Sequence, residues 1–226
     1  MREYWVDLAA VGFFVLEWTV YALTLERTAY GRDSLSARMH IYREVWIRNL
    51  LHRETRMVDT QIMASLQNGT AFFASTSLLA IGGGLALLRA TGDALNVLGA
   101  LPIDLIPSPA LLEIKCLGLI LIFIYAFFKF AWAYRLFNYV AILIGAMPPA
   151  AQKDTPQAEA HVMRTTRLFE AAGQHFNRGQ RAFFFALGYL GWFISPWLLI
   201  ATSIAVAIVL WRRQFASDSR NALIGP

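Results

Sequence analysis

The segment LLEIKCLGLILIFIYAFFKFAWAYRLFNYVAILIGAM, residues 111–147, decides the fold of this chain. It is a nearly unbroken apolar run, interrupted by Lys115, Lys129 and Arg135 and followed by Pro148. As an α-helix with a rise of about 1.5 Å per residue it would be roughly 55 Å long. The hydrocarbon core of a bilayer is only about 30 Å thick. The segment therefore predicts a helix that crosses a membrane and continues beyond it.

The composition of the whole chain indicates an integral membrane protein. Of its 226 residues, 57% are hydrophobic and only 15% are charged, whereas soluble domains average about 25% charged residues. The mean hydropathy of +0.47 agrees with this class. We expect an all-α fold in a single integral membrane domain, residues 1–226, with four transmembrane helices and cytoplasmic amphipathic helices. The expected spans are 5–25, 62–88, 111–135 with a helical extension to 147, and 182–211. Pro196 is expected to kink the last of them.

Two basic segments separate the predicted spans. Residues 26–59 contain seven arginines, and apolar residues recur there at helical spacing after a candidate N-cap at Ser34, which predicts an amphipathic helix. This helix could lie at the membrane interface or pack on the other basic segment. A second amphipathic helix is expected at 161–177. Four spans and the positive-inside rule place both basic segments in the cytoplasm and both termini on the non-cytoplasmic side of the cell (inner) membrane, although Arg212 and Arg213 oppose that orientation.

The remaining composition limits the partners. A net charge of +5 beside membrane spans serves topology and headgroup contacts, so we expect no nucleic-acid partner. Cys116 is the only cysteine, which excludes a disulfide within the chain. The four histidines fall in the basic segments without metal-ligand spacing, and we expect no metal site and no cofactor. The expected partners are the lipid bilayer, further copies in a homo-oligomer, and a larger membrane complex.

Charged residues inside predicted spans are the first candidates for a functional role, because each costs at least about 2.5 kcal/mol at mid-membrane. Glu17 and Lys129 are the main ones, and we predict that Glu17 pairs with Lys129 or with a polar group of the second span. The alternatives are a contact that only fixes packing, a transport or proton role, and a carboxyl that snorkels or stays neutral. Lys115 and Arg135, near the ends of the third span, are expected to snorkel.

The first half of the second span is unusually polar. Gln61, Ser65, Asn68, Phe72 and Ser75 follow helical spacing and share one face. This face could hydrogen-bond to other helices, or it could line a water-filled path. Together with Glu17 and Lys129, the residues Ser65, Asn68 and Ser75 form the candidate pathway or interhelical polar network.

Residues 136–147 are apolar although they follow the charges that should mark the inner boundary of the third span. We expect them to continue the helix out of the bilayer and to be covered by the two basic segments or by a neighbouring subunit. The alternative is a strongly tilted span that ends near Pro148.

Three stretches carry a family resemblance: ASTSLLAIGG (74–83), IKCLGLILIFIYAFFKFAWAYRLFNY (114–139) and NRGQRAFFFALGYLGWFISPW (177–197). With these, most of the chain resembles the multi-pass membrane proteins of domain-of-unknown-function family 599, DUF599. The resemblance implies a four-span helical architecture. It implies no activity and supplies no catalytic residue, because the family has no established function.

Two classes of function fit the sequence. The favoured one is a homo-oligomeric channel or a pathway for a small solute or ion, with the second-span polar face and Glu17 towards water. The other is a structural or accessory assembly subunit of a membrane complex. An enzyme is not expected, because no nucleophile–base or metal pairing is visible.

Overall fold

A computed structural model describes residues 2–93 and 108–224. Within these ranges the long helices are α1 (Arg2–Arg27), α4 (Met57–Arg89), α6 (Pro109–Gly145), α7 (Pro156–Tyr189) and α8 (Pro196–Phe215). Shorter elements are α2 (Ala29–Arg32), α3 (Leu35–Asn49), α9 (Asp218–Ile224) and 3-10 turns at Leu50–His52, Ala150–Gln152 and Leu190–Phe193. No strand occurs in the part of the chain that is described, which confirms the all-α prediction.

Helices long and apolar enough to cross a membrane number four among the described residues: Trp5–Arg27, Met57–Arg89, Pro109–Gly145 and Pro196–Leu223. The chain is an all-α polytopic membrane protein, as predicted. The first three of these helices coincide with the predicted spans.

The predicted fourth span, 182–211, requires correction, because it is not one kinked helix. α7 ends at Tyr189, and α8 begins at Pro196 behind a Ser195 N-cap whose hydroxyl accepts the Leu198 N–H at 3.0 Å. α8 then folds back along α7, and the Thr202 hydroxyl donates to the Gly188 carbonyl at 2.6 Å. Proline has no N–H to lose at the first turn of a helix. Pro196 therefore starts a new helix where a kink was expected.

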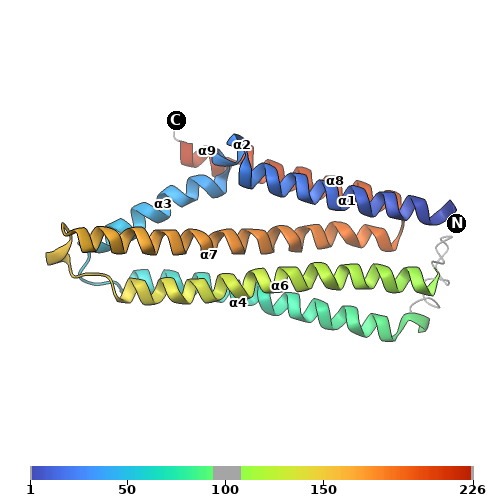
Figure 1. Cartoon of the computed structure of the whole chain (residues 1–226), viewed down its shortest axis with the longest axis horizontal. Helices are drawn as coiled ribbons and strands as arrows, with labels where there is room; N and C mark the ends of the chain where they lie inside the picture. Colours follow the sequence, from blue (N-terminus) through green and yellow to red (C-terminus); the bar gives the residue numbers. More distant parts are fainter. Residues whose placement is uncertain (1, 94–107, 225–226) are drawn as a thin grey trace.

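The directions of the helices can be followed in Figure 1. α1 and α8 run parallel, because Asp7 contacts Trp192 just before α8, while Ser36, shortly after α1, contacts Gln214 near the end of α8. α7 runs beside them in the direction opposite to α8, and both α1 and α8 end partway along it. That both termini lie on the non-cytoplasmic side stays a prediction.

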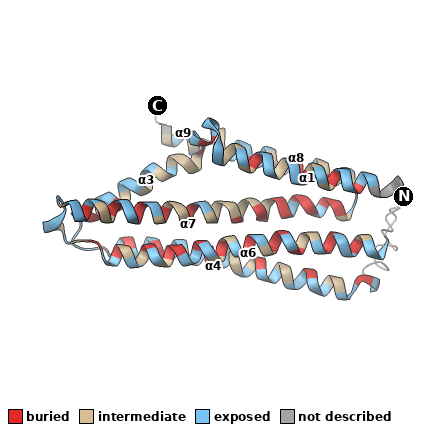
Figure 2. Cartoon of the chain, in the orientation of Figure 1, coloured by how far each residue is buried: buried red, intermediate tan, exposed pale blue. Residues whose placement is uncertain are grey.

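Two hydrophobic cores follow one another along α6, and buried residues mark both in Figure 2. The first core joins α1, α6, α7 and α8 around Phe14, Phe130 and Phe185. The second core buries the last turns of α6, including Phe137 and Val140, among residues of α3, α4 and the first half of α7. α3 thus packs on the other basic segment. Both basic segments cover one face of the apolar stretch that follows Arg135, while Ile142 on the other face is 66% exposed.

The contact between α6 and α7 requires glycine at position 179. A Cβ there would lie 2.7–2.9 Å from the Phe130 ring, which is itself completely buried. A rigid ring in a packed core cannot move away cheaply.

We expect Gly179→Ala to lower the free energy of unfolding by roughly 1–3 kcal/mol through overpacking. Gly69→Ala on α4 is the matched control, since a Cβ there meets nothing within 4 Å. Thermal melting in detergent measures both. Equal melting temperatures for the two variants would contradict the packing described.

Candidate functional site

The structure does not bring the predicted site residues together. Glu17 faces α8, beside the Ser203 hydroxyl, in a small, mostly apolar groove of about 260 Å³ that also contacts Ile204 and Trp211. The Lys129 ammonium lies 5.1 Å from the centre of the Tyr125 ring. No ion pair involves Glu17 or Lys129 among the described residues. The predicted pairing of Glu17 with Lys129 or with a polar group of the second span is therefore wrong, because Glu17 lies beside Ser203 of α8 and Lys129 beside Tyr125.

The polar residues of α4 lie on its outer surface. Ser65, Asn68 and Ser75 are exposed, and none hydrogen-bonds through its side chain to another described residue. The polar contact that α4 does make with α6 comes from a different face, where Gln67 donates to Asn138 at 2.7 Å. The α4 face is thus open to lipid, water or another chain.

A buried charged cluster at the end of the bundle that holds the start of α1 escaped the sequence analysis. The Trp192 indole N–H donates to Asp7 at 2.6 Å, and the Lys115 ammonium lies 5.5 Å from the centre of the Trp192 ring. Asp7 also acts electrostatically on Lys115. Lys115 is buried, with 4% of its surface exposed, so the prediction that it snorkels is corrected. The indole and Asp7 offer it a polar environment inside the bundle.

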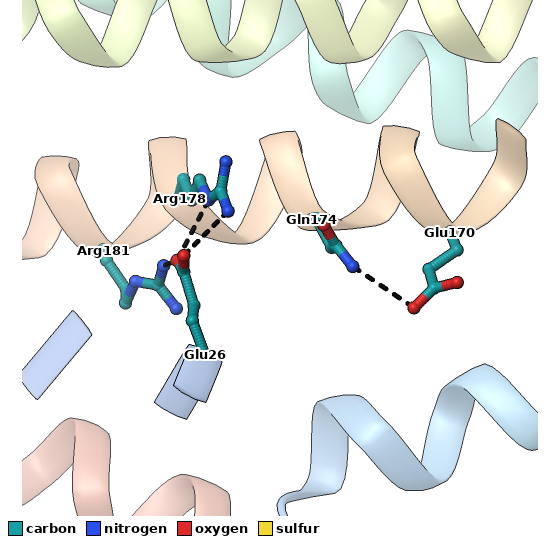
Figure 3. Close-up of polar contacts among 5 residues, drawn as sticks. All are labelled: Glu26, Glu170, Gln174, Arg178 and Arg181. Carbon is teal, nitrogen blue, oxygen red and sulfur yellow. Dashed lines mark hydrogen bonds and ion pairs between the residues drawn. The ribbon is translucent and has the colours of Figure 1, made fainter. Parts of the chain in front are cut away.

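At the other end of α1, a carboxylate joins two helices (Figure 3). Glu26 accepts hydrogen bonds from Arg178 at 3.0 and 2.7 Å and also pairs with Arg181, both on α7. The hydrogen bond to Glu26 raises the pKa of the Arg178 guanidinium. Arginine binds a carboxylate through two parallel N–H groups, which fixes geometry as well as charge. The end of α1 is thereby held against the middle of α7.

Beside this ion pair lies a cleft of about 860 Å³ between the ends of α1 and α8, α2, α3 and the middle of α7. Its apolar wall includes Tyr21, Phe73 and Phe184, which belong to the first core or pack against it. Its polar wall contains five arginines and two glutamates, a surplus of three positive charges. These residues are Arg27, Arg43, Arg178, Arg181, Arg213, Glu26 and Glu170.

The polar wall is incompletely neutralised. His40 pairs with Glu170 at 3.3 Å, while the buried Nδ1 of His40 has no hydrogen-bond partner among the described residues. The guanidinium carbon of Arg43 lies 5.4 Å from the centre of the Phe169 ring. The guanidinium carbon of Arg213 lies 6.0 Å from the centre of the Phe184 ring. Burial lowers the pKa of Arg43, and Glu170 acts in the opposite direction. The cleft thus offers guanidinium donors next to apolar surface.

The described residues contain no group of three or more His, Cys, Asp and Glu that could hold a metal ion. The arrangement of arginines favours binding of an anion over nucleophilic catalysis. Sequence spacing could not reveal this cleft, because its walls come from segments separated by more than a hundred residues. The available signal was the abundance of arginine in the two basic segments and the Arg212–Arg213 pair after the last span.

These features define a polytopic helical membrane protein whose polar groups gather at the two ends of its shorter helices. The chain belongs to the family described as "Protein of unknown function, DUF599", whose model matches residues 9–219. This confirms the family resemblance drawn from the sequence. Neither the curated proteins nor the solved structures give a match to this chain.

The buried cluster gives a stability prediction. Asp7→Ala leaves the buried Trp192 N–H without its acceptor, and we expect the free energy of unfolding to fall by roughly 1–3 kcal/mol. Leu8→Ala, at a neighbouring position that is 63% exposed, is the control and should change little. Melting in detergent, followed by near-UV circular dichroism of the tryptophans, measures both. A loss of stability no larger than that of Leu8→Ala would show that the hydrogen bond contributes nothing.

Proposed function

We propose that the chain is an assembly or accessory subunit of the inner membrane and not a channel lined by its own helices. The observation that carries this proposal is the difference in helix length. α8 has 20 residues and would be about 30 Å long, which matches a bilayer core. α4, α6 and α7 have 33, 37 and 34 residues. Figure 1 shows that α1 and α8 end partway along α7.

This difference sets the level of the membrane boundary. Glu26 near the end of α1 binds Arg178 and Arg181, so that level lies near Arg178 on α7. On α4 it lies near Phe73, whose ring packs on Phe176 of α7 at 5.9 Å. Ser65 and Asn68 precede Phe73 by eight and five residues, so they lie roughly 12 and 8 Å beyond the boundary. Water accounts for their polarity without a pore.

The distribution of charge supports a cytoplasmic location for the extended end. The basic segments, the end of α8 and α9 together place fifteen Lys and Arg at or beyond this level, against Arg2, Arg89 and Lys115 towards the other end. With α7 as a fifth passage through the membrane, the positive-inside rule places the N-terminus outside and the C-terminus in the cytoplasm. Arg212 and Arg213, which opposed the four-span orientation, agree with this one. The cytoplasmic part comprises α3, the start of α4, the end of α6 and the first half of α7.

The outer face of α4 is the surface on which we propose assembly with a second copy. Gly69, Gly82 and Gly83 leave open space where a Cβ would meet no atom within 4 Å. Small residues on a membrane helix allow another helix to approach closely. Ser75, exposed near the boundary, could then hydrogen-bond across the interface instead of facing lipid.

The orientation is tested with reporter fusions. Green fluorescent protein attached after Pro226 should fluoresce, because that reporter folds in the cytoplasm. Alkaline phosphatase inserted after Asp93 should be active, because that enzyme requires the oxidising outer compartment. A dark fluorescent-protein fusion together with an inactive phosphatase fusion would reverse the orientation, and a dark fluorescent-protein fusion together with an active phosphatase fusion would replace the five-passage topology by one with both positions outside.

A cysteine scan in a Cys116→Ser background separates the accessory proposal from a channel. Ser65→Cys and Asn68→Cys should react with a membrane-impermeant maleimide from the cytoplasmic side only, since both lie beyond the boundary. Ser75→Cys should form a disulfide-linked dimer on oxidation, since it lies on the proposed contact between copies. Purified protein in liposomes should pass no ion or small solute.

Labelling of all three cysteines from both sides, together with a flux that Glu17→Gln changes, would favour the channel. Absence of the Ser75→Cys dimer, in protein that stays folded and shows no flux, would rule out the α4 contact and leave assembly with a different partner.

A further inference from the structure

The cleft between α1, α3, α7 and α8 has a composition that the assembly proposal does not require. A cavity of about 860 Å³ with a surplus of three positive charges is unusual for a site that only joins helices. A helix contact neutralises its charges within the protein, as Glu26 does for Arg178 and Arg181. Here Arg43 and Arg213 form no ion pair with a carboxylate of the described residues, and only the field of the nearby Glu170 acts on Arg43.

Arg43 and Arg213 are the two guanidinium groups that matter most. Each stacks on a phenylalanine ring, and neither donates a side-chain hydrogen bond or forms an ion pair with another described residue. Stacking leaves the in-plane N–H groups of a guanidinium available to an oxygen ligand. The buried, unpartnered Nδ1 of His40 adds a third polar atom to the same wall.

The polar and the apolar walls of the cleft lie at different depths along the bundle. Arg178, Arg181 and Arg213 lie at the level where α1 and α8 end, and Arg43 lies beyond it beside Phe169 and Gly173. On the other side, Tyr21, Leu25 and Leu210 extend the wall into the first, apolar core. A ligand that fills it would carry an anionic head beside an apolar part. Arginine matches phosphate oxygens with two parallel N–H groups, and the cytoplasmic leaflet is rich in anionic phospholipids.

We propose that this cleft binds a phosphate group on Arg43 and Arg213, with the phosphodiester of an anionic phospholipid as the source that also satisfies the apolar wall. Glu26 limits the positive charge of the site by engaging Arg178 and Arg181. A free phosphate ester would use the same guanidinium groups and leave the apolar wall empty.

The test uses native mass spectrometry of the full-length protein in detergent with an equimolar mixture of phosphatidylglycerol and phosphatidylcholine. The protein should retain phosphatidylglycerol in preference. Arg213→Gln should weaken that retention about tenfold, the effect of losing one charge-assisted contact. Arg212→Gln is the matched control, because Arg212 has the same charge at the same membrane level and lines the groove beside Glu17 instead of this cleft. Glu26→Gln should strengthen retention several-fold, because it frees two arginines.

Inorganic phosphate, added in a parallel melting experiment, distinguishes the two sources. A rise in melting temperature with phosphate that Arg213→Gln abolishes, without selective lipid retention, would support the phosphate site and assign it to a soluble ligand. Equal loss of lipid in Arg212→Gln and Arg213→Gln would overturn the proposal, since it indicates general attraction to the basic surface. Equal retention of the two lipids by the unmodified protein, with no response to phosphate, would overturn it as well. Arg43→Gln repeats the test from α3, provided that its melting temperature shows a folded protein.

Discussion

The length of α6 is the constraint on which the rest of this structure depends. A helix of 37 residues is roughly 55 Å long, while lipid can cover only about 30 Å of it. The remaining turns are as apolar as the first ones, so they need a protein cover. α3, the start of α4 and the first half of α7 supply it, and together they bury Phe137, Val140 and Ile144. The basic segments are therefore structural parts of the fold, and their charged faces are the outer surface of a second core.

The boundary between the two cores is where the polar chemistry concentrates. Helices α1 and α8 end at this level, and the cleft lies between their last turns and α7. Glu26 forms part of the cleft wall and binds two arginines of α7. An ion pair that is partly exposed contributes little to stability, about 0–1 kcal/mol. Its larger effect is positional, because it fixes the distance between α1 and α7 and so maintains the cleft beside them.

The sequence was sufficient for the parts of the fold that depend on composition and length. It predicted the helical class, three of the spans and, as one of two covers, the basic segments on residues 136–147, of which one face is buried. It failed where geometry between helices decides the outcome. Residues 182–211 form one apolar run, and hydropathy cannot distinguish a long helix from two antiparallel ones. The Ser195-Pro196 pair is a helix start by its capping chemistry, yet a proline inside an apolar run also fits a kink. The sequence does not contain the rotation of each helix about its axis, which turns Glu17 towards Ser203 of α8 and Lys129 towards Tyr125.

The polar face of α4 shows that polar residues of a membrane helix can be interpreted only when their depth in the bilayer is known. Polar residues at helical spacing are expected both along a pore and on a helix that has left the bilayer. The two cases differ only in the level of the boundary, which the sequence of α4 alone does not contain. The proposed level rests on the partners: α8 is too short to extend farther, Glu26 ties the end of α1 to Arg178, and Phe73 packs on Phe176. At that proposed level, Ser65 and Asn68 need no pathway to explain them. The strongest unexplained polar feature of the chain is then the arginine-lined cleft at the same level.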